Sequence, residues 1–341
     1  MLYYIGGFPP PYGGVTVKNR DLFEAISKKK RIKKIDLNKI KKKNIKEAIR
    51  FLFALLNRKS VFIVGVAEHS REKLHKMLYT CNRKAANRSL VFLMGGTASA
   101  KICSSKEYKK ITSSFKRVYV ETMGMKRELE KSGLNNIDYY PNCRFKPNKK
   151  YEIEYNATDP LNVVFFSLIQ PMKGADDVIE AAKLLPEIHF SFYGSIEKGY
   201  QEQFLQEVER LNNVVYHGLF NGKNEDTYNE LSKYDVLLFP TKWDTEGVPG
   251  ILVEAKIAGL ACVVSNKSYN SELIIDSEQG IVLEENNLNS LVQALNRLNS
   301  NRRLLDELKR NNQRSSEMFY IETYLSNILK DLKYRKGKGI A

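Results

Sequence analysis

The chain has 341 residues, of which 43% are hydrophobic, and it carries 55 Lys and Arg against 39 Asp and Glu. This size predicts two globular domains, each with its own core. The longest apolar run near the start, residues 51–56, is far shorter than the roughly 20 residues that a membrane span needs. The amino terminus lacks the basic region of a signal peptide, and the four cysteines are scattered without metal-ligand spacing. We therefore expect a cytoplasmic protein without a metal site.

Positive charge is concentrated in the first half of the chain. Residues 1–150 contain 35 Lys and Arg against 11 Asp and Glu, whereas residues 151–341 contain 20 against 28. The densest stretch, residues 28–46, is followed closely by the apolar residues 51–56, a combination that favours an anionic membrane surface. A merely solvated, lysine-rich surface remains an alternative. Nucleic acid is disfavoured, because no recognition-helix, RNP-type or zinc-finger pattern is present. The candidate membrane or acceptor face consists of Lys39, Lys41, Lys42 and Lys43.

The first elements predict a doubly wound α/β domain. A strand at residues 2–8 leads into the loop 9–17, which contains Gly13 and Gly14, and then into a helix ending near Ser27. A glycine turn between a strand and a helix offers backbone amides to an anion, although the G-x-G-x-x-G spacing of a dinucleotide site is missing. Helical stretches separate several of the later strand-like runs. These runs are residues 60–66, 89–96, 117–122 and 136–142.

A polar stretch, residues 146–160, predicts a linker, after which strands and helices alternate again. The carboxyl-terminal part, from Ser290, is helical and ends in a basic tail. The fold class expected is therefore α/β, with two doubly wound, Rossmann-like domains facing each other across a cleft.

The segment Thr245–Gly259 places two carboxylates, Glu246 and Glu254, around the start of a helix. Pro249 suits the first helical position and Gly259 the residue after the last, which predicts a helix over residues 249–258 between two buried strands. The loop then lies at the carboxyl end of a strand, where open α/β sheets bind their ligands, and the helix amino end favours an anion. Two carboxylates at this spacing suit a polyhydroxylated ligand. Alternatively, each Glu is only a dipole partner or a solvated side chain.

The whole chain resembles the GT-B glycosyltransferases, specifically the retaining group called glycosyltransferase family 4. The segment "EGVPGILVEAKIAG" is similar to the E-x7-E signature of that family, with Glu246 and Glu254 in the acidic places. "FFSLIQPMKGADDVIEAAKLL" resembles its phosphate-binding segment, with Lys173 and Gly174 matching, and "PPPYGGVTV" resembles its amino-terminal glycine loop. "VYVETMGMKRELEKSGLNNIDYYPN" resembles the end of its first domain, with Asn142 at the hinge.

The resemblance implies residue roles. Glu254 would bind the ribose of a nucleotide-sugar, Glu246 the donor sugar, and Lys173 the diphosphate leaving group, which makes Glu246 and Lys173 the expected catalytic residues. Two positions depart from the pattern. Leu168 stands where the family has an Arg, for which Arg144, Lys18 or Arg20 are candidate substitutes, and the usual first-domain His is not evident, His69 being the nearest. The remaining donor-binding positions implied are Gly13, Gly14, Gly218, Leu219, Gly247 and Val248.

The resemblance also implies the organisation and the reaction. Residues 1–145 would bind the acceptor, 146–160 would link, 161–320 would bind the donor, and 321–341 would form a terminal helix and basic tail that packs back on the first domain. The expected function is retaining transfer of a sugar, from a UDP-sugar and without a cofactor or metal, to a lipid-linked glycan in bacterial surface polysaccharide biosynthesis. The enzyme would sit peripherally on the inner face of the cytoplasmic membrane. A catalytically weak partner or regulatory subunit and a nucleotide-sugar epimerase remain alternatives.

Overall fold

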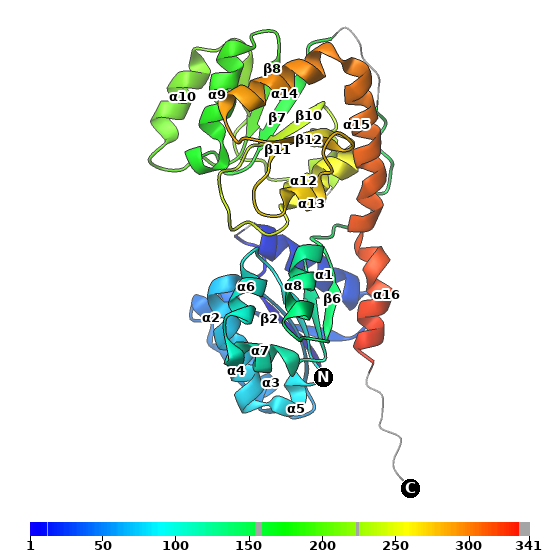
Figure 1. The fold of residues 1–341 in the computed structure, drawn as a ribbon. Coiled ribbons are helices and arrows are strands. Elements are labelled where there is room, and N and C mark those ends of the chain that lie inside the picture. Colours follow the sequence, from blue (N-terminus) through cyan, green and yellow to red (C-terminus); the bar gives the residue numbers. More distant parts are fainter. Residues whose placement is uncertain (12, 154–158, 223–224, 334–341) are drawn as a thin grey trace. The chain divides into compact units, whose positions relative to one another are not determined.

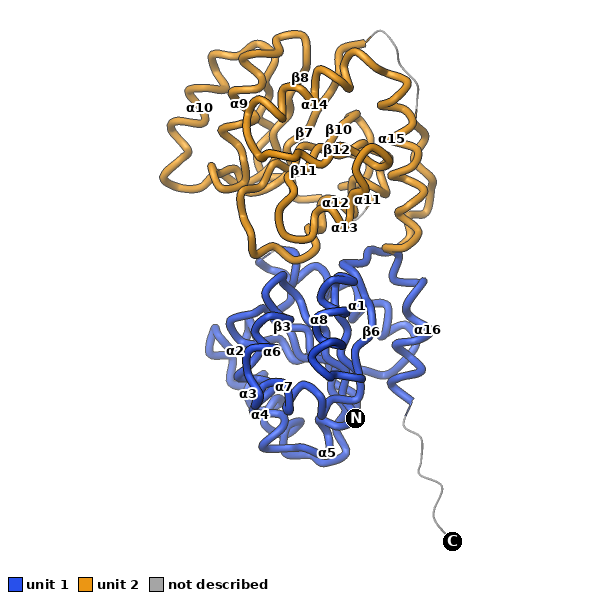
Figure 2. The backbone as a smooth tube through the Cα atoms, in the orientation of Figure 1, with its two compact units in different colours: residues 1–145, 320–341 blue, residues 146–319 orange. Residues whose placement is uncertain are grey.

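The chain folds into two compact units. The computed structural model describes residues 1–341 except 12, 154–158, 223–224 and 334–341. The first unit comprises residues 1–145 and 320–341, and the second comprises residues 146–319 (Figure 2). Each contains a six-stranded parallel sheet with helices on its faces, so the expected α/β class with two doubly wound sheets is confirmed. Part of the expected linker, residues 154–158, and the end of the basic tail, residues 334–341, lie outside the described residues.

The first sheet has the strand order β2-β1-β3-β4-β5-β6. From β1 the chain runs to β2 at one edge and then returns to β3 on the other side of β1, so the order reverses between β1 and β3. Strand β2 was not expected, because the sequence Ile-Lys-Lys-Ile-Asp reads as part of a basic run; only its end, Ile35 and Asp36, is buried. The strands are β1 (Leu2–Gly6), β2 (Ile32–Asp36), β3 (Val61–Val66), β4 (Leu90–Leu93), β5 (Arg117–Val120) and β6 (Ile137–Tyr139).

One buried amide joins β1, β3 and the first helix at this reversal. Asn19 in helix α1 (Gly14–Ser27) donates from Nδ2 to the carbonyls of Gly7 (2.9 Å) and Gly65 (2.8 Å), and its Oδ1 accepts from the Tyr4 hydroxyl at 2.9 Å. A Cβ at Gly65 would lie 2.1 Å from Asn19 Oδ1, so glycine is required for this close approach. Asn19 therefore fixes the start of α1 against the carboxyl ends of both strands.

The helices of the first unit include one from the end of the chain. Helix α16 packs against α1 (Figure 1). Its Ile321 and Ile328 are buried in the same cluster as Leu22 and Ile26. The helices are α1 (Gly14–Ser27), α2 (Leu37–Lys41), α3 (Ile45–Leu56), α4 (Glu68–Cys81), α5 (Arg83–Ala86), α6 (Ala98–Cys103), α7 (Lys106–Ser113), α8 (Met123–Lys131) and α16 (Ile321–Asp331).

The second sheet has the strand order β12-β11-β10-β7-β8-β9. The chain runs outward from β7 through β8 to β9 and then returns to β10 on the other side of β7, so the reversal lies between β7 and β10. In open α/β sheets a ligand binds at the carboxyl ends of the strands at such a reversal. The strands are β7 (Asn162–Phe166), β8 (His189–Tyr193), β9 (Val214–Tyr216), β10 (Val236–Phe239), β11 (Ala261–Ser265) and β12 (Gly280–Leu283).

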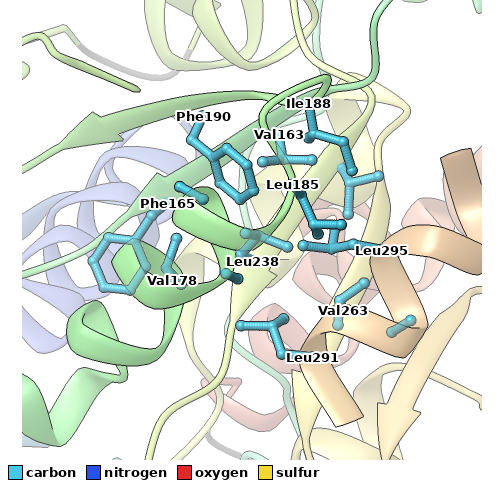
Figure 3. Close-up of a cluster of buried hydrophobic side chains, with 14 of the residues drawn as sticks. Val163, Phe165, Val178, Leu185, Ile188, Phe190, Leu238, Val263, Leu291 and Leu295 are labelled. Carbon is cyan, nitrogen blue, oxygen red and sulfur yellow. The ribbon is translucent and has the colours of Figure 1, made fainter. Parts of the chain in front are cut away.

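The core of the second unit follows the alternation of side chains along its strands. Val163 and Phe165 of β7 point to one face with Leu238 of β10 and Val263 of β11, where they meet Leu291 of α14 (Figure 3). The helices are η1 (Pro171–Lys173), α9 (Ala175–Leu184), α10 (Gln201–Glu209), α11 (Glu225–Leu231), α12 (Gly250–Ala258), α13 (Asn270–Leu273), α14 (Leu288–Ser300), α15 (Arg302–Ser315) and η2 (Ser316–Phe319).

Helix α12 differs by one residue from its expected bounds. Pro249 is the residue before the helix, with extended backbone angles, rather than its first residue. The expected end is confirmed, because α12 stops at Ala258 and Gly259 adopts the left-handed conformation at φ 83°.

Candidate functional site

A tight turn brings Lys173 to the carboxyl end of β10. Strand β7 is followed by the short helix η1, which ends in Lys173, and Gly174 at φ 83° is the residue before α9. A Cβ at Gly174 would lie 2.4 Å from the carbonyl oxygen of Pro240, directly after β10, so both the backbone angle and the space require glycine. The backbone N–H of Lys242 also donates to the carbonyl of Met172 at 2.9 Å. The turn after β7 is thereby fastened to the loop after β10.

The loop after β10 holds Glu246 at this same point. Thr241 is fully buried, and its hydroxyl donates to Glu246 Oε1 at 3.3 Å. Its carbonyl accepts from Ser265 Oγ, at the end of β11, at 2.7 Å. The hydroxyl of Ser268 donates to the Glu246 carbonyl. Side chains from two neighbouring strand ends therefore position the Glu246 carboxylate.

Lys173 and Glu246 form an ion pair across the strand reversal. Lys173 Nζ contacts Glu246 Oε1, and the side chains are only 16% and 14% exposed. The ammonium also lies 5.5 Å from the centroid of the Trp243 ring. Burial lowers the pKa of Lys173 to about 8, while a neighbouring carboxylate favours the charged form. The result is a cation held at the strand reversal, the place where open α/β sheets generally bind their ligands.

The amino end of α12 follows directly in the chain. Gly247 and Val248 lie between Glu246 and the helix, and Val248 is buried. Pro249, the residue before α12, makes no side-chain capping bond, and the N–H of Leu252 in the first turn donates to the Pro249 carbonyl at 3.2 Å. The positive end of the helix dipole still favours an anion or oxygen ligand at this place. Glu254 is half-buried in the second turn. The structure thus places the two carboxylates on one loop-helix segment, and Lys173 joins the first of them.

Two expected donor residues lie farther along the same edge of the sheet. Gly218, at φ 77°, and Leu219 follow β9, and the Gly218 carbonyl accepts from the N–H of Gly194 after β8 at 2.9 Å. The ring of His217 stacks on that of Tyr193, with centroids 4.5 Å apart. Leu219 is largely exposed. These residues share the carboxyl edge of the sheet with Lys173 and Glu246, two strands away from β7.

The other expected positions lie in the first unit. Gly13 has extended backbone angles at φ −176°, and a Cβ there or at Gly14 would meet none of the described atoms within 4 Å. The side chains of Lys39, Lys41, Lys42 and Lys43 are exposed in and after α2.

Two of the three cations considered as substitutes for the family Arg are buried. Lys18 pairs with Glu121 at 2.8 Å, and Arg144 donates to Asn142 Oδ1 at 2.8 Å, both being 2% exposed. Arg20 pairs with Asp21 at 2.7 Å. These side chains are engaged in holding the first unit together. Leu168 is partly exposed just after β7.

Lys256, in the middle of α12, was not singled out in the sequence. Its Nζ donates to Gln279 Oε1 (2.8 Å), Asn312 Oδ1 (2.7 Å) and Ser315 Oγ (2.8 Å), and the side chain is fully buried. Burial lowers its pKa to about 8. The sequence signal for its burial is that Lys256 lies directly between Ala255 and Ile257 in an apolar helix. Its partners could not be read from the local sequence, because they lie 23 to 59 positions away. Lys256 ties α12 to α15 and so supports the carboxylate-bearing segment.

The described residues contain neither a metal-ligand cluster nor a membrane-spanning helix. No group of three or more His, Cys, Asp and Glu side chains in them could hold a metal ion. None of the helices in the described part of the chain has the length and apolar character needed to cross a membrane.

The second unit matches a known family of enzymes. Residues 148–315 match the family described as glycosyl transferases group 1. Among curated proteins, 203 residues are 28% identical to the UDP-Gal:alpha-D-GlcNAc-diphosphoundecaprenol alpha-1,3-galactosyltransferase of Escherichia coli, covering 58% of this chain and 50% of that protein. An uncharacterized glycosyltransferase of Methanocaldococcus jannaschii is 26% identical over 180 residues, 52% of this chain and 50% of that protein. The match therefore spans about half the length of these relatives.

Solved structures decide the architecture. Anabaena HepE in complex with UDP aligns with a TM-score of 0.75 at 14% identity, over 97% of this chain and 99% of that chain. The fold is GT-B. WaaG, a glycosyltransferase involved in lipopolysaccharide biosynthesis, has the same GT-B architecture, with a TM-score of 0.61 at 13% identity over 96% of this chain and 99% of that chain. At these identities the likeness concerns the fold, and the chemistry must be argued from the residues.

Proposed function

We propose that the protein transfers a glycosyl group from a UDP-sugar to a lipid-linked glycan acceptor, with retention at the anomeric carbon, on the cytoplasmic side of a bacterial membrane. The observation that carries this proposal is the Lys173–Glu246 pair at the β7/β10 reversal, which the amino end of α12 follows directly in the chain. A partly buried cation and the amino end of a helix suit a diphosphate, and two carboxylates suit hydroxyl groups.

The comparisons support the choice of donor and acceptor. The E. coli relative is named for a UDP-galactose donor and a diphosphoundecaprenol-linked acceptor. HepE has been solved with UDP and with UDP-glucose. We infer that the second unit holds the nucleotide-sugar and that the first unit holds the acceptor. Gly13 and Gly14 leave open backbone that a donor phosphate can approach.

In this mechanism the bond between the anomeric carbon and the diphosphate oxygen breaks, and the acceptor oxygen bonds to that carbon on the same face. The departing phosphate takes the acceptor proton. Lys173 and the amides of α12 stabilise the negative charge that develops on the diphosphate. Glu246 orients the sugar hydroxyls and Glu254 the ribose, so no protein carboxylate forms a bond to the sugar, in contrast to retaining glycosidases. Neither a metal nor a cofactor is needed.

A thermal-shift screen tests the donor assignment. The protein is heated with UDP-, GDP-, ADP- and dTDP-sugars, beside Glu254→Gln, since a ligand that binds only the folded state raises the midpoint. We expect a rise with UDP-sugars that is reduced in the variant. If none of the nucleotide-sugars raises the melting midpoint, a non-catalytic partner subunit would be favoured. Interconversion of free UDP-sugars without an acceptor would favour an epimerase.

A further inference from the structure

Helix α3 presents a row of large apolar side chains to solvent. Ile45, Ile49, Leu52, Phe53 and Leu56 are between 48% and 73% exposed. Their spacing of four, three, one and three residues places them along one face of the helix. Scattered apolar residues are normal on a protein surface, but a contiguous row of five on one helix marks an interaction site. We call this row the α3 apolar face.

The opposite side of α3 anchors the helix and fixes this orientation. Ala54 and Leu55 are buried, and so is Glu47, whose Oε1 accepts from the backbone N–H of Asp36 at 2.8 Å. The side chain of Asn44 caps the helix by accepting from the Glu47 N–H at 3.0 Å. Because these contacts hold the helix to β2, rotation cannot bury the α3 apolar face without exposing them.

Positive charge surrounds the α3 apolar face. Residues 37–59 contain eight Lys and Arg and a single acidic residue, Glu47. That carboxylate is buried and pairs with Arg50 at 2.6 Å, so it contributes little negative charge to the surface. The basic residues lie before the helix, within it and after it, and all are exposed. They are Lys39, Lys41, Lys42, Lys43, Lys46, Arg50, Arg58 and Lys59.

We infer that α3 docks on an anionic lipid bilayer, with its apolar face in the boundary between headgroups and acyl chains and its lysines on the lipid phosphates. An apolar strip flanked by cations is the chemistry that recognises such a surface. The 12 residues of α3 extend about 18 Å, too short for a hydrocarbon core of roughly 30 Å, so the helix lies along the surface. The proposed function places the reaction at a membrane, and this inference deepens it by naming the surface of the protein that contacts the lipid.

The charges also argue against a second copy of the chain as the occupant. A two-fold symmetric contact would bring the same surface of both copies together. The lysines of residues 39–46 would then face those of the other copy, and like charges in contact oppose association. An anionic bilayer satisfies both the apolar row and the cations around it.

Vesicle co-sedimentation without any nucleotide-sugar tests the inference, so a failure of the proposed reaction leaves the readout unchanged. The full chain is mixed with vesicles of 30% phosphatidylglycerol in phosphatidylcholine or of phosphatidylcholine alone. We expect at least tenfold tighter binding to the anionic vesicles, lost as salt rises. The double variant Leu52→Gln/Phe53→Gln should weaken this binding at least tenfold. A quadruple variant, in which Lys39, Lys41, Lys42 and Lys43 are all replaced by Gln, should weaken it at least as much. Leu184→Gln, at a residue 59% exposed on α9, is the matched control and should bind as the unchanged protein does.

Equal binding to both vesicle types, or unchanged binding by the Leu52/Phe53 variant, would overturn the inference. Light scattering of the lipid-free protein tests the other possible occupant of the α3 apolar face, which is a second copy of the chain. A dimer that the same double variant dissociates, together with no vesicle binding, would assign the α3 apolar face to a second copy instead. Because the changed residues are exposed, their replacement by Gln should leave the melting temperature unchanged.

Discussion

Lys173 and Glu246, which are 73 positions apart in the chain, contact each other through Nζ and Oε1 at the point where the second sheet reverses its strand order. In this ion pair each charge satisfies the other. In the reaction we propose, an incoming diphosphate would compete with Glu246 for Lys173, and the released carboxylate would then accept from sugar hydroxyls. Under that proposal, binding of the diphosphate to Lys173 would free Glu246 to position the donor sugar.

This exchange predicts opposite effects of Glu246→Gln on binding and turnover. The variant removes the carboxylate that competes for Lys173, so UDP should bind with unchanged affinity or up to about tenfold more tightly. Transfer should fall on the order of 100-fold, because the charged acceptor for the sugar hydroxyls is gone. Calorimetry and a transfer assay measure the two quantities. Asp244→Asn, which changes an exposed carboxylate of the same loop, should leave both intact; parallel losses in both variants would contradict the assignment.

Binding of UDP should depend on pH through Lys173. With a pKa of about 8 in the free protein, the ammonium is charged below pH 8 and loses its proton above it. Since only the charged form attracts a diphosphate, the Kd of UDP should rise by up to tenfold per pH unit between about 8 and 10. Lys173→Arg keeps the charge throughout this range and should remove the dependence. The same rise in wild type and Lys173→Arg would place the titrating group elsewhere.

The two doubly wound sheets could be predicted because their central strands are continuous apolar runs, as in β10 and β11. Strand β2 escaped prediction for the opposite reason. It is an edge strand in which Lys33 and Lys34 are exposed to solvent. Its sequence is therefore charged and lacks the continuous apolar run that identifies a central strand.

The candidate site was predictable only in its local parts. Gly174 and Gly259 both adopt positive φ angles, and their places next to helix ends follow from local sequence. The contact of Lys173 with Glu246 arises because β7 and β10 are neighbours in the sheet, and the order of strands in a sheet cannot be predicted from a local sequence pattern. From the sequence alone Lys256 would be interpreted as a solvated side chain. In the structure, α15 and the segment before β12 bring three acceptors together around its ammonium group. Long-range packing therefore decides which charges are functional and which are structural.

Substitution of two glycines by Ala should separate folding from function. Gly174→Ala places a Cβ 2.4 Å from the Pro240 carbonyl at a φ of 83°, so we expect a loss of stability of at least about 1–3 kcal/mol and a displaced Lys173. Gly13→Ala meets no described atom and should leave the melting temperature unchanged. If donor phosphate approaches this backbone, Gly13→Ala should still reduce transfer. Full activity of Gly13→Ala would remove Gly13 from the donor site.

Lys256→Met should destabilise the second unit by at least about 2 kcal/mol, because it leaves up to three acceptors in or beside the core without their charged donor. Denaturant unfolding followed by fluorescence measures the loss. Lys267→Met is the control, since Lys267 pairs at the surface with Asp244 at 3.0 Å and such pairs contribute little. A smaller loss at Lys256 than at Lys267 would refute the structural role assigned to the buried lysine.

The most direct test of the donor site is calorimetric titration of UDP into the wild-type protein and Lys173→Gln at pH 7. We predict one UDP bound per chain and an affinity about 10- to 100-fold weaker in the variant, as expected for loss of a charge-assisted contact to phosphate. Equal affinities in the two proteins, or no binding of UDP to the wild type, would contradict the claim that the β7/β10 reversal is the nucleotide-sugar site.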